Sequence, residues 1–232
     1  MTALTDREFL RLHIESCWGI TIPPIEHANV DLLVTAPALP PWSVYQATLS
    51  DDQVTLWRPD VSPDQRADLL QRARSAGVTY DPALGMRREV VLRLSTTLLE
   101  SRAVLRYPAR LLTVADEALL EAFEAGSAAY FLDPRCAPCM GVVVDGQLVS
   151  VAHSSRRTAA ACALGINTIP EARRQGYATI AVRAWTQAIL REGLTPIYSA
   201  FAYNTASLRL AAATGYVSVS ESVYGPIAAA AE

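Results

Sequence analysis

The dipeptide Asp145-Gly146 lies between two apolar runs and constrains the fold of this chain more than any other feature. Met140–Val144 precede it, and Gln147–His153 follow it. Asp-Gly readily adopts the positive backbone angles of a type I′ turn, so the two runs are predicted to pair as an antiparallel hairpin. Residues 159–168 follow as a third antiparallel strand. The second half of the chain is therefore predicted to contain a meander.

Capping boxes predict three helices, because a hydroxyl at the N-cap and an acid or amide three residues later satisfy free backbone amides. The first predicted helix runs from Thr5 to about Cys17, the second begins at Ser62 and has Gly77 just past its end, and the third begins at Thr113 and stops at Gly126. Three more strands are predicted at Val44–Leu49, Val54–Trp57 and Val90–Leu94, the first two as a hairpin. Two candidate joints are Pro40-Pro41-Trp42 and residues 95–106, although neither has the composition of a flexible linker. The 232 residues suffice for one α/β domain or two small ones.

Composition excludes several classes of protein. The net charge of -3 argues against nucleic acid as the main partner. All 20 lysine and arginine positions are arginine. Hydrophobic residues make up 51% of the chain, enough for a real core. No apolar run approaches the roughly 18 to 20 residues that cross a bilayer, and residues 1–8 lack a secretory pattern. We therefore expect a soluble cytoplasmic protein without a membrane partner.

Four cysteines are present, and only Cys136-Ala-Pro-Cys139 has the spacing of a metal or redox pair. A zinc site would need a second pair nearby. Pro134 and Pro138 instead favour a turn that leads into the strand at Met140. The sequence therefore predicts no metal site.

The stretch from Ile166 to Ala178 predicts a strand, a short loop and a helix. Gly176 stands directly before the helical periodicity, which continues to Gly193. Such a junction directs backbone amides and the positive end of the helix toward one point, which suits a pyrophosphate. Arg173 and Arg174 add positive charge. The stretch matches neither the nucleotide P-loop nor the dinucleotide glycine pattern.

Two motifs in this order resemble the GNAT superfamily of N-acetyltransferases. The first is Arg173-x-x-Gly176-x-Ala178, the acyl-CoA signature of that superfamily. The second is Asn204-x-x-Ser207, followed at Gly215-Tyr216 by the end of a helix. An apolar strand at residues 196–202 precedes the second motif, as the fifth strand does in the superfamily. The resemblance covers roughly residues 142–224 and is closest to a bacterial subgroup with an added N-terminal region.

The resemblance implies a GNAT acyl-CoA N-acyltransferase fold, an α/β fold with a mixed sheet and a V-shaped gap between its fourth and fifth strands. It implies a GNAT domain at residues 101–232 and an N-terminal α/β extension at residues 1–100. Acetyl-CoA is the implied donor, without a metal. The residues that the resemblance assigns to this donor are Thr168, Ile169, Arg173, Arg174, Gln175, Gly176, Tyr177, Ala178, Asn204 and Ser207.

Catalytic residues are less evident. Members of the superfamily often carry a carboxylate on the fourth strand and a tyrosine four residues before the helix-ending glycine. Here residues 160–168 contain no acid, and the second position is Ala211. His153 is the candidate base, because it is the only histidine in this half of the chain. Glu171 and ordered water are the alternatives. The candidate acids are Tyr203, Tyr216 and Tyr224, and a reaction without an acid stays open because thiolate is a tolerable leaving group.

Three interpretations of function follow. The first is an N-acyltransferase that moves an acetyl group from acetyl-CoA to a small-molecule amine or a peptide by direct attack. The second is a catalytically silent, CoA-binding regulatory module. The third is an interaction domain that does not bind CoA. Residues 1–100 are expected to form a wall of the acceptor cleft or the surface of a homodimer.

Overall fold

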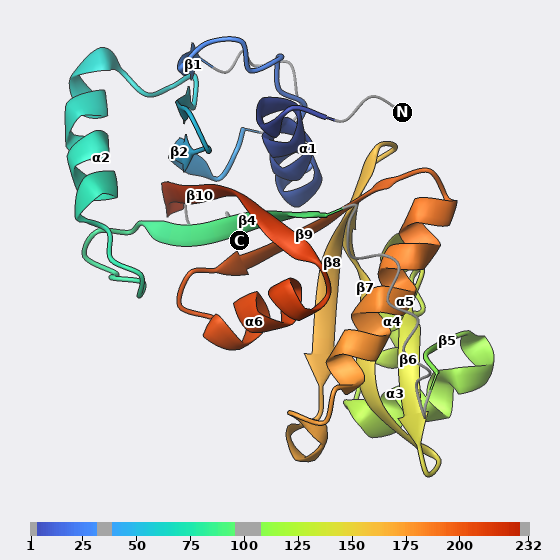
Figure 1. The fold of residues 1–232 in the computed structure, drawn as a ribbon. Helices are drawn as coiled ribbons and strands as arrows, with labels where there is room; N and C mark the ends of the chain where they lie inside the picture. The colour runs from blue at the N-terminus through green and yellow to red at the C-terminus, as the bar shows by residue number, and fades with distance from the viewer. Residues whose placement is uncertain (1–3, 32–38, 96–107, 228–232) are drawn as a thin grey trace. The chain divides into compact units, whose positions relative to one another are not determined.

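The helix starts that the sequence predicts are in place in the computed structural model, which describes residues 4–31, 39–95 and 108–227 (Figure 1). In helix α1 (Asp6–Trp18), the Thr5 amide donates to Glu8 Oε2 at 2.8 Å, and the Glu8 amide donates to Thr5 Oγ1 at 3.2 Å. Gly19 ends this helix with φ +63°. These contacts satisfy amides that the first turn leaves without helical partners.

The chain forms two units. The first contains Met1–Arg93, Ser199–Leu208 and Val217–Glu232, and the second contains Leu94–Tyr198 and Arg209–Tyr216. The C-terminal segments of the first unit therefore belong with the N-terminal residues. Residue 100, where the sequence analysis divides the chain, and nearly all of the candidate joint at residues 95–106 lie outside the described residues. The proposed division at that residue stays a prediction.

The first unit is a sheet with two helices. Its elements are α1, β1 (Asn29–Asp31), β2 (Trp42–Thr48), β3 (Gln53–Trp57), α2 (Pro63–Ser75), β4 (Arg87–Leu94, up to Arg93), and the first-unit parts of β9 (Thr195–Phe201, from Ser199), α6 (Thr205–Ala213, up to Leu208) and β10 (Tyr216–Ile227, from Val217). Strand β2 pairs antiparallel with β3, as the sequence predicts, and also with β10. Strand β1 pairs with β3 in parallel.

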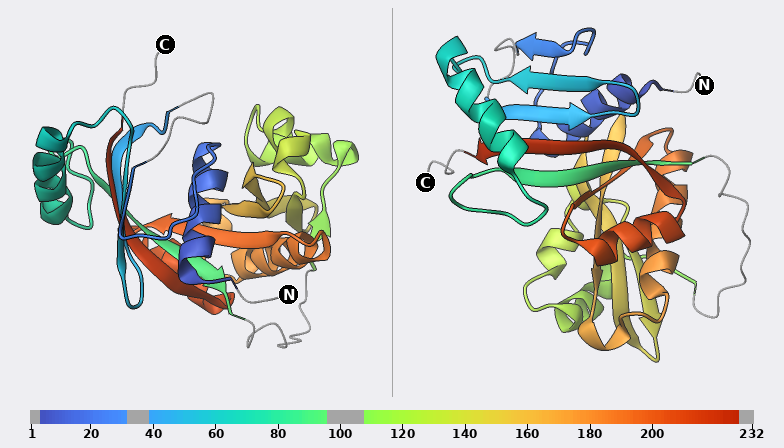
Figure 2. Two further views of the ribbon diagram at one scale, coloured as in Figure 1. Left: turned by 90° about the horizontal axis from the view of Figure 1, so that it is seen from above. Right: turned by 60° about the vertical axis from the view of Figure 1, so that its left-hand side comes forward.

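Helices α1 and α2 pack on opposite faces of this sheet (Figure 2). On one face, Val44 of β2, Trp57 of β3 and Val223 of β10 form a core with Leu69 and Ala73 of α2. The neighbouring residue of β2, Tyr45, points to the other face because strand side chains alternate. There its hydroxyl donates to Glu89 Oε1 at 2.7 Å.

A buried polar cluster lies under α1. His13 Nε2 lies 3.0 Å from Glu89 Oε1, and His13 Nδ1 lies 3.4 Å from Cys17 Sγ. Burial favours the neutral imidazole, but neighbouring Cys17 and Glu89 outweigh it and raise the pKa of His13 to about 10. His13 is therefore a buried cation paired with a carboxylate.

The second unit contains a mixed sheet with helices on both faces. Its elements are β5 (Arg110–Leu111), α3 (Glu117–Phe123), α4 (Ala128–Phe131), β6 (Met140–Val144), β7 (Gln147–Arg157), β8 (Ala161–Thr168), α5 (Tyr177–Arg191), β9 (Thr195–Phe201, up to Tyr198), α6 (Thr205–Ala213, from Arg209) and the first residue of β10 (Tyr216–Ile227). The strand order is β9-β8-β7-β6-β5.

The predicted meander is confirmed. Strands β6 and β7 pair antiparallel around Asp145 (φ +49°) and Gly146 (φ +80°), and β8 pairs antiparallel with β7 along its whole length. Strand β9 is parallel to β8, but their register contains only Ala161–Ala163 against Thr195–Ile197. Strand β8 thus continues for five residues, Leu164–Thr168, beyond its last register partner on β9.

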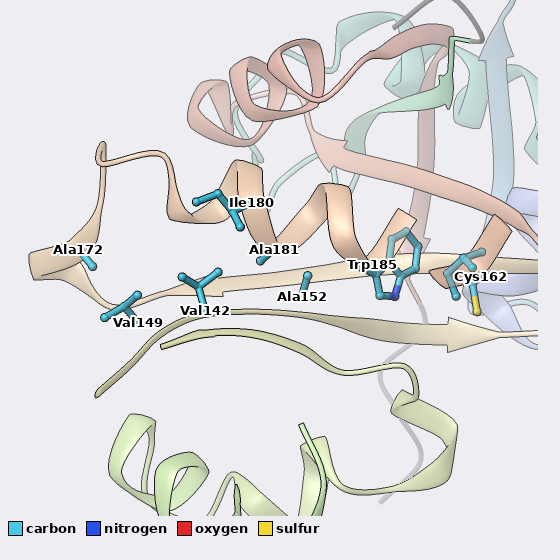
Figure 3. Packing of buried hydrophobic residues seen from close by; sticks show 9 residues of the cluster. Val142, Val149, Ala152, Cys162, Ala172, Ile180, Ala181 and Trp185 are labelled. Carbon is cyan, nitrogen blue, oxygen red and sulfur yellow. The ribbon is translucent and has the colours of Figure 1, made fainter. Parts of the chain in front are cut away.

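Helix α5 covers one face of this sheet, and α3 and α4 cover the other (Figure 2). Figure 3 shows the α5 side, where Ala181 and Trp185 pack against Val142 of β6 and Ala152 of β7. The Trp185 indole donates to Ser154 Oγ at 3.2 Å. On the opposite face, Val151 packs with Leu120 of α3 and Phe131 of α4. Neighbouring residues of β7 therefore pack into the hydrophobic cores on opposite faces of the sheet.

The structure corrects three details of the sequence predictions. The helix from Thr113 is a 3₁₀ turn, Val114–Asp116, followed by the two-turn helix α3, because the Asp116 carboxylate accepts from the Thr113 amide and from Arg110. Helix α2 ends at Ser75, because Ala76 is already extended (ψ 120°), so Gly77 does not terminate it. Strand β10 was not predicted.

No helix in the described part of the chain is long and apolar enough to cross a membrane.

The first prediction concerns His13. Because its pKa is higher in the folded chain, the stabilisation is complete below about pH 6.5 and is lost as the pH rises to about 10. We expect His13→Gln to lower the free energy of unfolding by about 3 kcal/mol at pH 6, since it leaves a buried carboxylate without a cation. The difference from wild type should shrink toward pH 10 in urea unfolding. A constant difference across this range would contradict a charged His13.

Candidate functional site

The N-terminus of α5 forms an open seat of backbone amides. Gly176 is its N-cap with φ +87°, and no side chain caps the first turn. The first turn contains no acidic residue. A Cβ built on Gly176 would meet no atom within 4 Å, so the approach to these amides is clear. The positive end of a 15-residue helix suits an anion.

The loop before Gly176 is held by its own hydrogen bonds. After β8 ends, Pro170–Ala172 form a 3₁₀ turn. The Gln175 side-chain amide donates to the Glu171 carbonyl at 3.0 Å, and Arg173 Nε donates to the Thr168 carbonyl at 3.3 Å. Arg174 adopts φ +62°, a conformation that is uncommon for residues other than glycine. Local bonding thus holds two exposed arginines beside the open helix end.

The end of β8 leads into this seat. Thr168 Oγ1 lies 2.9 Å from Ser150 Oγ of β7. The Ile169 amide already donates to the Val149 carbonyl at 3.1 Å. The structure therefore brings together the predicted donor residues from Thr168 to Ala178 in one continuous stretch of the second unit.

Asn204 and Ser207 lie in the first unit, at the start of α6. The Ser207 amide donates to Asn204 Oδ1 at 3.1 Å, so Asn204 caps α6 as the sequence predicts. Gly215, with φ +90°, follows the end of this helix. A role of Asn204 and Ser207 in donor binding stays a prediction.

His153 lies in the interior, on the face of β7 that α4 covers. The residue is only 4% exposed, and its imidazole ring packs edge-on against the ring of Phe131, with ring centroids 5.0 Å apart. Its Nε2 lies 3.1 Å from the hydroxyl oxygen of Tyr130, and its Nδ1 has no hydrogen-bond partner among the described residues. Burial lowers the pKa of His153 to about 4, so the ring is neutral at pH 7.

The three candidate tyrosines occupy different environments. Tyr203 is half exposed and stacks on Phe201. Tyr216 is buried, its hydroxyl lies 2.8 Å from Thr186 Oγ1, and burial raises its pKa. Tyr224 is buried against Tyr45 in the first unit, and burial raises its pKa as well. Ala211, at the position where the resemblance implies a tyrosine, is fully buried.

The Cys136–Cys139 pair lies in a turn, as predicted. Pro134–Cys136 form a 3₁₀ turn that leads into β6, and both thiols are free and buried. Burial raises the pKa of Cys139 to about 12. Within the described ranges, no three His, Cys, Asp or Glu side chains gather as metal ligands.

Tyr130 is the residue that sequence reasoning missed. It belongs to the four-residue helix α4, which is too short for a periodic pattern. No motif marks it in the sequence. Its relation to the site depends on His153, which lies 23 residues further along the chain.

These features define a mixed α/β fold with an anion seat at the end of a strand that outruns its parallel neighbour. The model of the GNAT acetyltransferase family matches residues 127–224, which extend from α4 into β10. This segment of the chain thus belongs to the GNAT superfamily, as the two motifs indicate. The match includes the whole seat, His153 and Tyr130.

The chain is also similar to solved structures. A GNAT-family acetyltransferase from Colwellia psychrerythraea is 14% identical over 78% of this chain and 80% of that one, with a TM-score of 0.50. A GNAT-family chain from Novosphingobium aromaticivorans DSM 12444 is 20% identical over 60% of this chain, with a TM-score of 0.47. The latter match spans 63% of that protein, less than two thirds of its length. No curated protein matches the sequence.

The second prediction concerns the charge of His153. Because burial alone lowers its pKa, we expect its imidazole to remain neutral as the pH falls from 8 to 5. Nuclear magnetic resonance titration of the imidazole signals tests this, with His153→Gln to assign the resonance. A midpoint near 6.5 would show that the ring is solvated and is not held as described.

Proposed function

We propose that this protein is an acyl-CoA-dependent N-acyltransferase that moves an acetyl group from acetyl-CoA to a primary amine by direct attack. The observation that carries the proposal is the open amide seat at Gly176, inside the segment that matches the GNAT acetyltransferase model. The GNAT fold of that segment supports the same reaction class. The acceptor is a small-molecule amine or a peptide.

The donor residues have distinct tasks in this proposal. The main-chain amides of Arg174, Gln175, Gly176 and Ala178 bind the pyrophosphate, and Tyr177 lies beside them. Arg173 contributes charge and braces the loop through the Thr168 carbonyl. The arm of CoA lies along β8 near Thr168 and Ile169. The Ile169 amide donates to the Val149 carbonyl, and the Ile169 carbonyl accepts from the Ala172 amide. The assignment of Asn204 and Ser207 to the donor stays a prediction from the resemblance.

The reaction requires a proton to leave the amine and a thiolate to depart. Strand β8 carries no carboxylate, and Ala211 carries no acid. These absences favour the alternative, a catalytically silent CoA-binding regulatory module. The candidate base His153 and candidate acids Tyr203, Tyr216 and Tyr224 stay predictions. A cytoplasmic location and a homodimer are further proposals that the activity does not require.

The third prediction tests the donor seat. Gly176→Glu places a bulky anion at the amides that would bind pyrophosphate, so we expect calorimetry to show acetyl-CoA binding weakened at least 10-fold. Gly193→Glu is the matched control, because Gly193 also has a positive φ (+76°), follows the other end of α5 and meets no atom within 4 Å.

Both variants strain a left-handed backbone position, at a cost of about 1 to 2 kcal/mol in the free energy of unfolding. Only Gly176→Glu should show weakened binding of acetyl-CoA. Equal binding by the two variants, or no saturable binding by wild type at high acetyl-CoA concentration, would overturn the proposed seat.

The fourth prediction separates the enzyme from the silent module. With acetyl-CoA and a panel of primary amines and short peptides, we expect release of free CoA above the rate without protein for at least one acceptor. Thiol detection measures the released CoA. Saturable binding of acetyl-CoA without turnover on any acceptor would favour the silent module.

A further inference from the structure

Tyr130 is a partly exposed residue of the second unit whose hydroxyl group is held by a buried histidine. The residue is 47% exposed, yet its hydroxyl oxygen lies 3.1 Å from Nε2 of the buried His153. The two rings meet edge-on, with centroids 5.4 Å apart. An exposed tyrosine normally rotates freely, whereas this one is tied to the protein interior. The contact with His153 therefore holds the Tyr130 hydroxyl in one defined orientation.

The imidazole lies directly over the backbone of β8. His153 pairs with Gly165, and a Cβ at Gly165 would lie 2.3 Å from Cε1 and 2.4 Å from Nε2 of the ring. Only glycine leaves space for the ring at this position. Gly165 comes two residues after Ala163, the last β8 residue in register with β9. The Tyr130–His153 pair is thus located where the free edge of β8 begins.

The donor seat lies at the other end of the same free edge. Gly165 and Thr168 are three residues apart, roughly 10 Å at about 3.3 Å per residue. The arm of CoA contains two amide groups, which can pair with an unpaired strand edge as an added strand does. If the pyrophosphate occupies the seat of the proposed function, the thioester at the end of the arm comes close to Gly165.

The acceptor must approach from the face on which Tyr130 lies. Ala172 of the donor loop and Ile180 of α5 pack on one face of the sheet, with Ala152. His153 points to the other face, toward Phe131 and Tyr130. A donor that comes from the α5 side leaves the opposite side of its carbonyl open to a nucleophile.

The pair has a defined protonation state. An orphaned lone pair costs less than an orphaned N–H, so we assign the proton of the neutral ring to Nε2, which donates to Tyr130, and leave Nδ1 bare. Burial and the neighbouring Cys136 raise the pKa of Tyr130, while Arg156 lowers it less. Tyr130 thus keeps its phenol proton, and its hydroxyl group is also hydrogen-bonded to the side chain of Cys136.

We propose that Tyr130 is the catalytic proton-transfer residue of the acyl transfer and that His153 is the positioning residue that orients its hydroxyl group. The assignment rests on the proposed function and deepens it. It supplies a hydroxyl that the sequence lacks at Ala211, from a different element and the opposite face of the sheet.

The step is balanced without an added reactant. The neutral amine nitrogen attacks the thioester carbonyl carbon, and the C–N bond forms. A proton passes from this nitrogen to the Tyr130 oxygen while the phenol proton passes to the sulfur. The C–S bond then breaks, and CoA leaves as the thiol. Tyr130 ends as a neutral phenol, and His153 keeps its proton throughout.

The test compares Tyr130→Phe with wild type, using the amine with the highest rate in the acceptor panel. We expect kcat to fall at least 100-fold, as loss of a proton-transfer group does, while calorimetry shows acetyl-CoA binding unchanged within about twofold. Tyr80→Phe, at another partly exposed tyrosine in the first unit, is the matched control and should keep the wild-type rate. Thermal unfolding monitors whether each variant is folded.

Two variants of His153 test its positioning role. His153→Gln keeps an N–H at about the reach of Nε2 and should retain kcat within about fivefold. His153→Leu removes the donor and should reduce kcat nearly as much as Tyr130→Phe. With saturating acceptor, kcat of wild type should show no ionisation between pH 6 and 9, because neither partner changes its charge there. A change in wild-type kcat with a midpoint near pH 6.5 that is absent in His153→Gln would identify His153 itself as the base and overturn the assignment.

The outcomes separate the assignment from the proposed function. If wild type turns over and kcat of Tyr130→Phe lies within threefold of the wild-type value, the role of Tyr130 is overturned and the proposed function stands. Binding of acetyl-CoA without turnover on any acceptor would overturn that role and favour the silent module. Absence of acetyl-CoA binding by wild type would overturn the donor seat and the role of Tyr130 together.

Discussion

The short parallel pairing of β8 with β9 is the constraint on which the rest of the second unit depends. Strand β8 is paired with β7 over its whole length, but its register with β9 ends at Ala163. Backbone groups beyond that point need another partner, because unpaired polar groups are costly when water is excluded. One strand edge thereby links the Tyr130–His153 pair at Gly165 with the amide seat after Thr168. The chemistry that we propose uses both ends.

The two buried histidines show how partners decide charge. His13 lies against Glu89 and Cys17 and is held protonated, whereas His153 lies among aromatic rings beside a neutral phenol and is held neutral. Burial opposes the charged form in both cases. Cys17 and the Glu89 carboxylate reverse this effect only for His13. The first histidine therefore stabilises a core, while the second is suited to orient a hydroxyl without titrating.

Local signals predicted most of the elements and the donor seat. Capping boxes identified the starts of α1, α2 and the turn before α3, and Asp145-Gly146 identified the hairpin, because each depends on residues a few positions apart. Strand β10 escaped prediction. Its partners include β2, which is about 170 residues earlier in the chain, and Gly225-Pro226 interrupts its pattern. Helix α4 is too short to show a period.

The sequence by itself determined where the backbone turns, where helices begin and which loop exposes amides to an anion. These properties follow from the conformational preferences of single residues such as Gly176, and neighbours in sequence suffice to express them. Only the tertiary structure decided which side chains meet. Tyr130, His153 and Gly165 come from a helix and two strands, and their contact depends on strand register and on the packing of α4 against the sheet. Such contacts are set by the shape of a packed core, and no short stretch of residues records that shape.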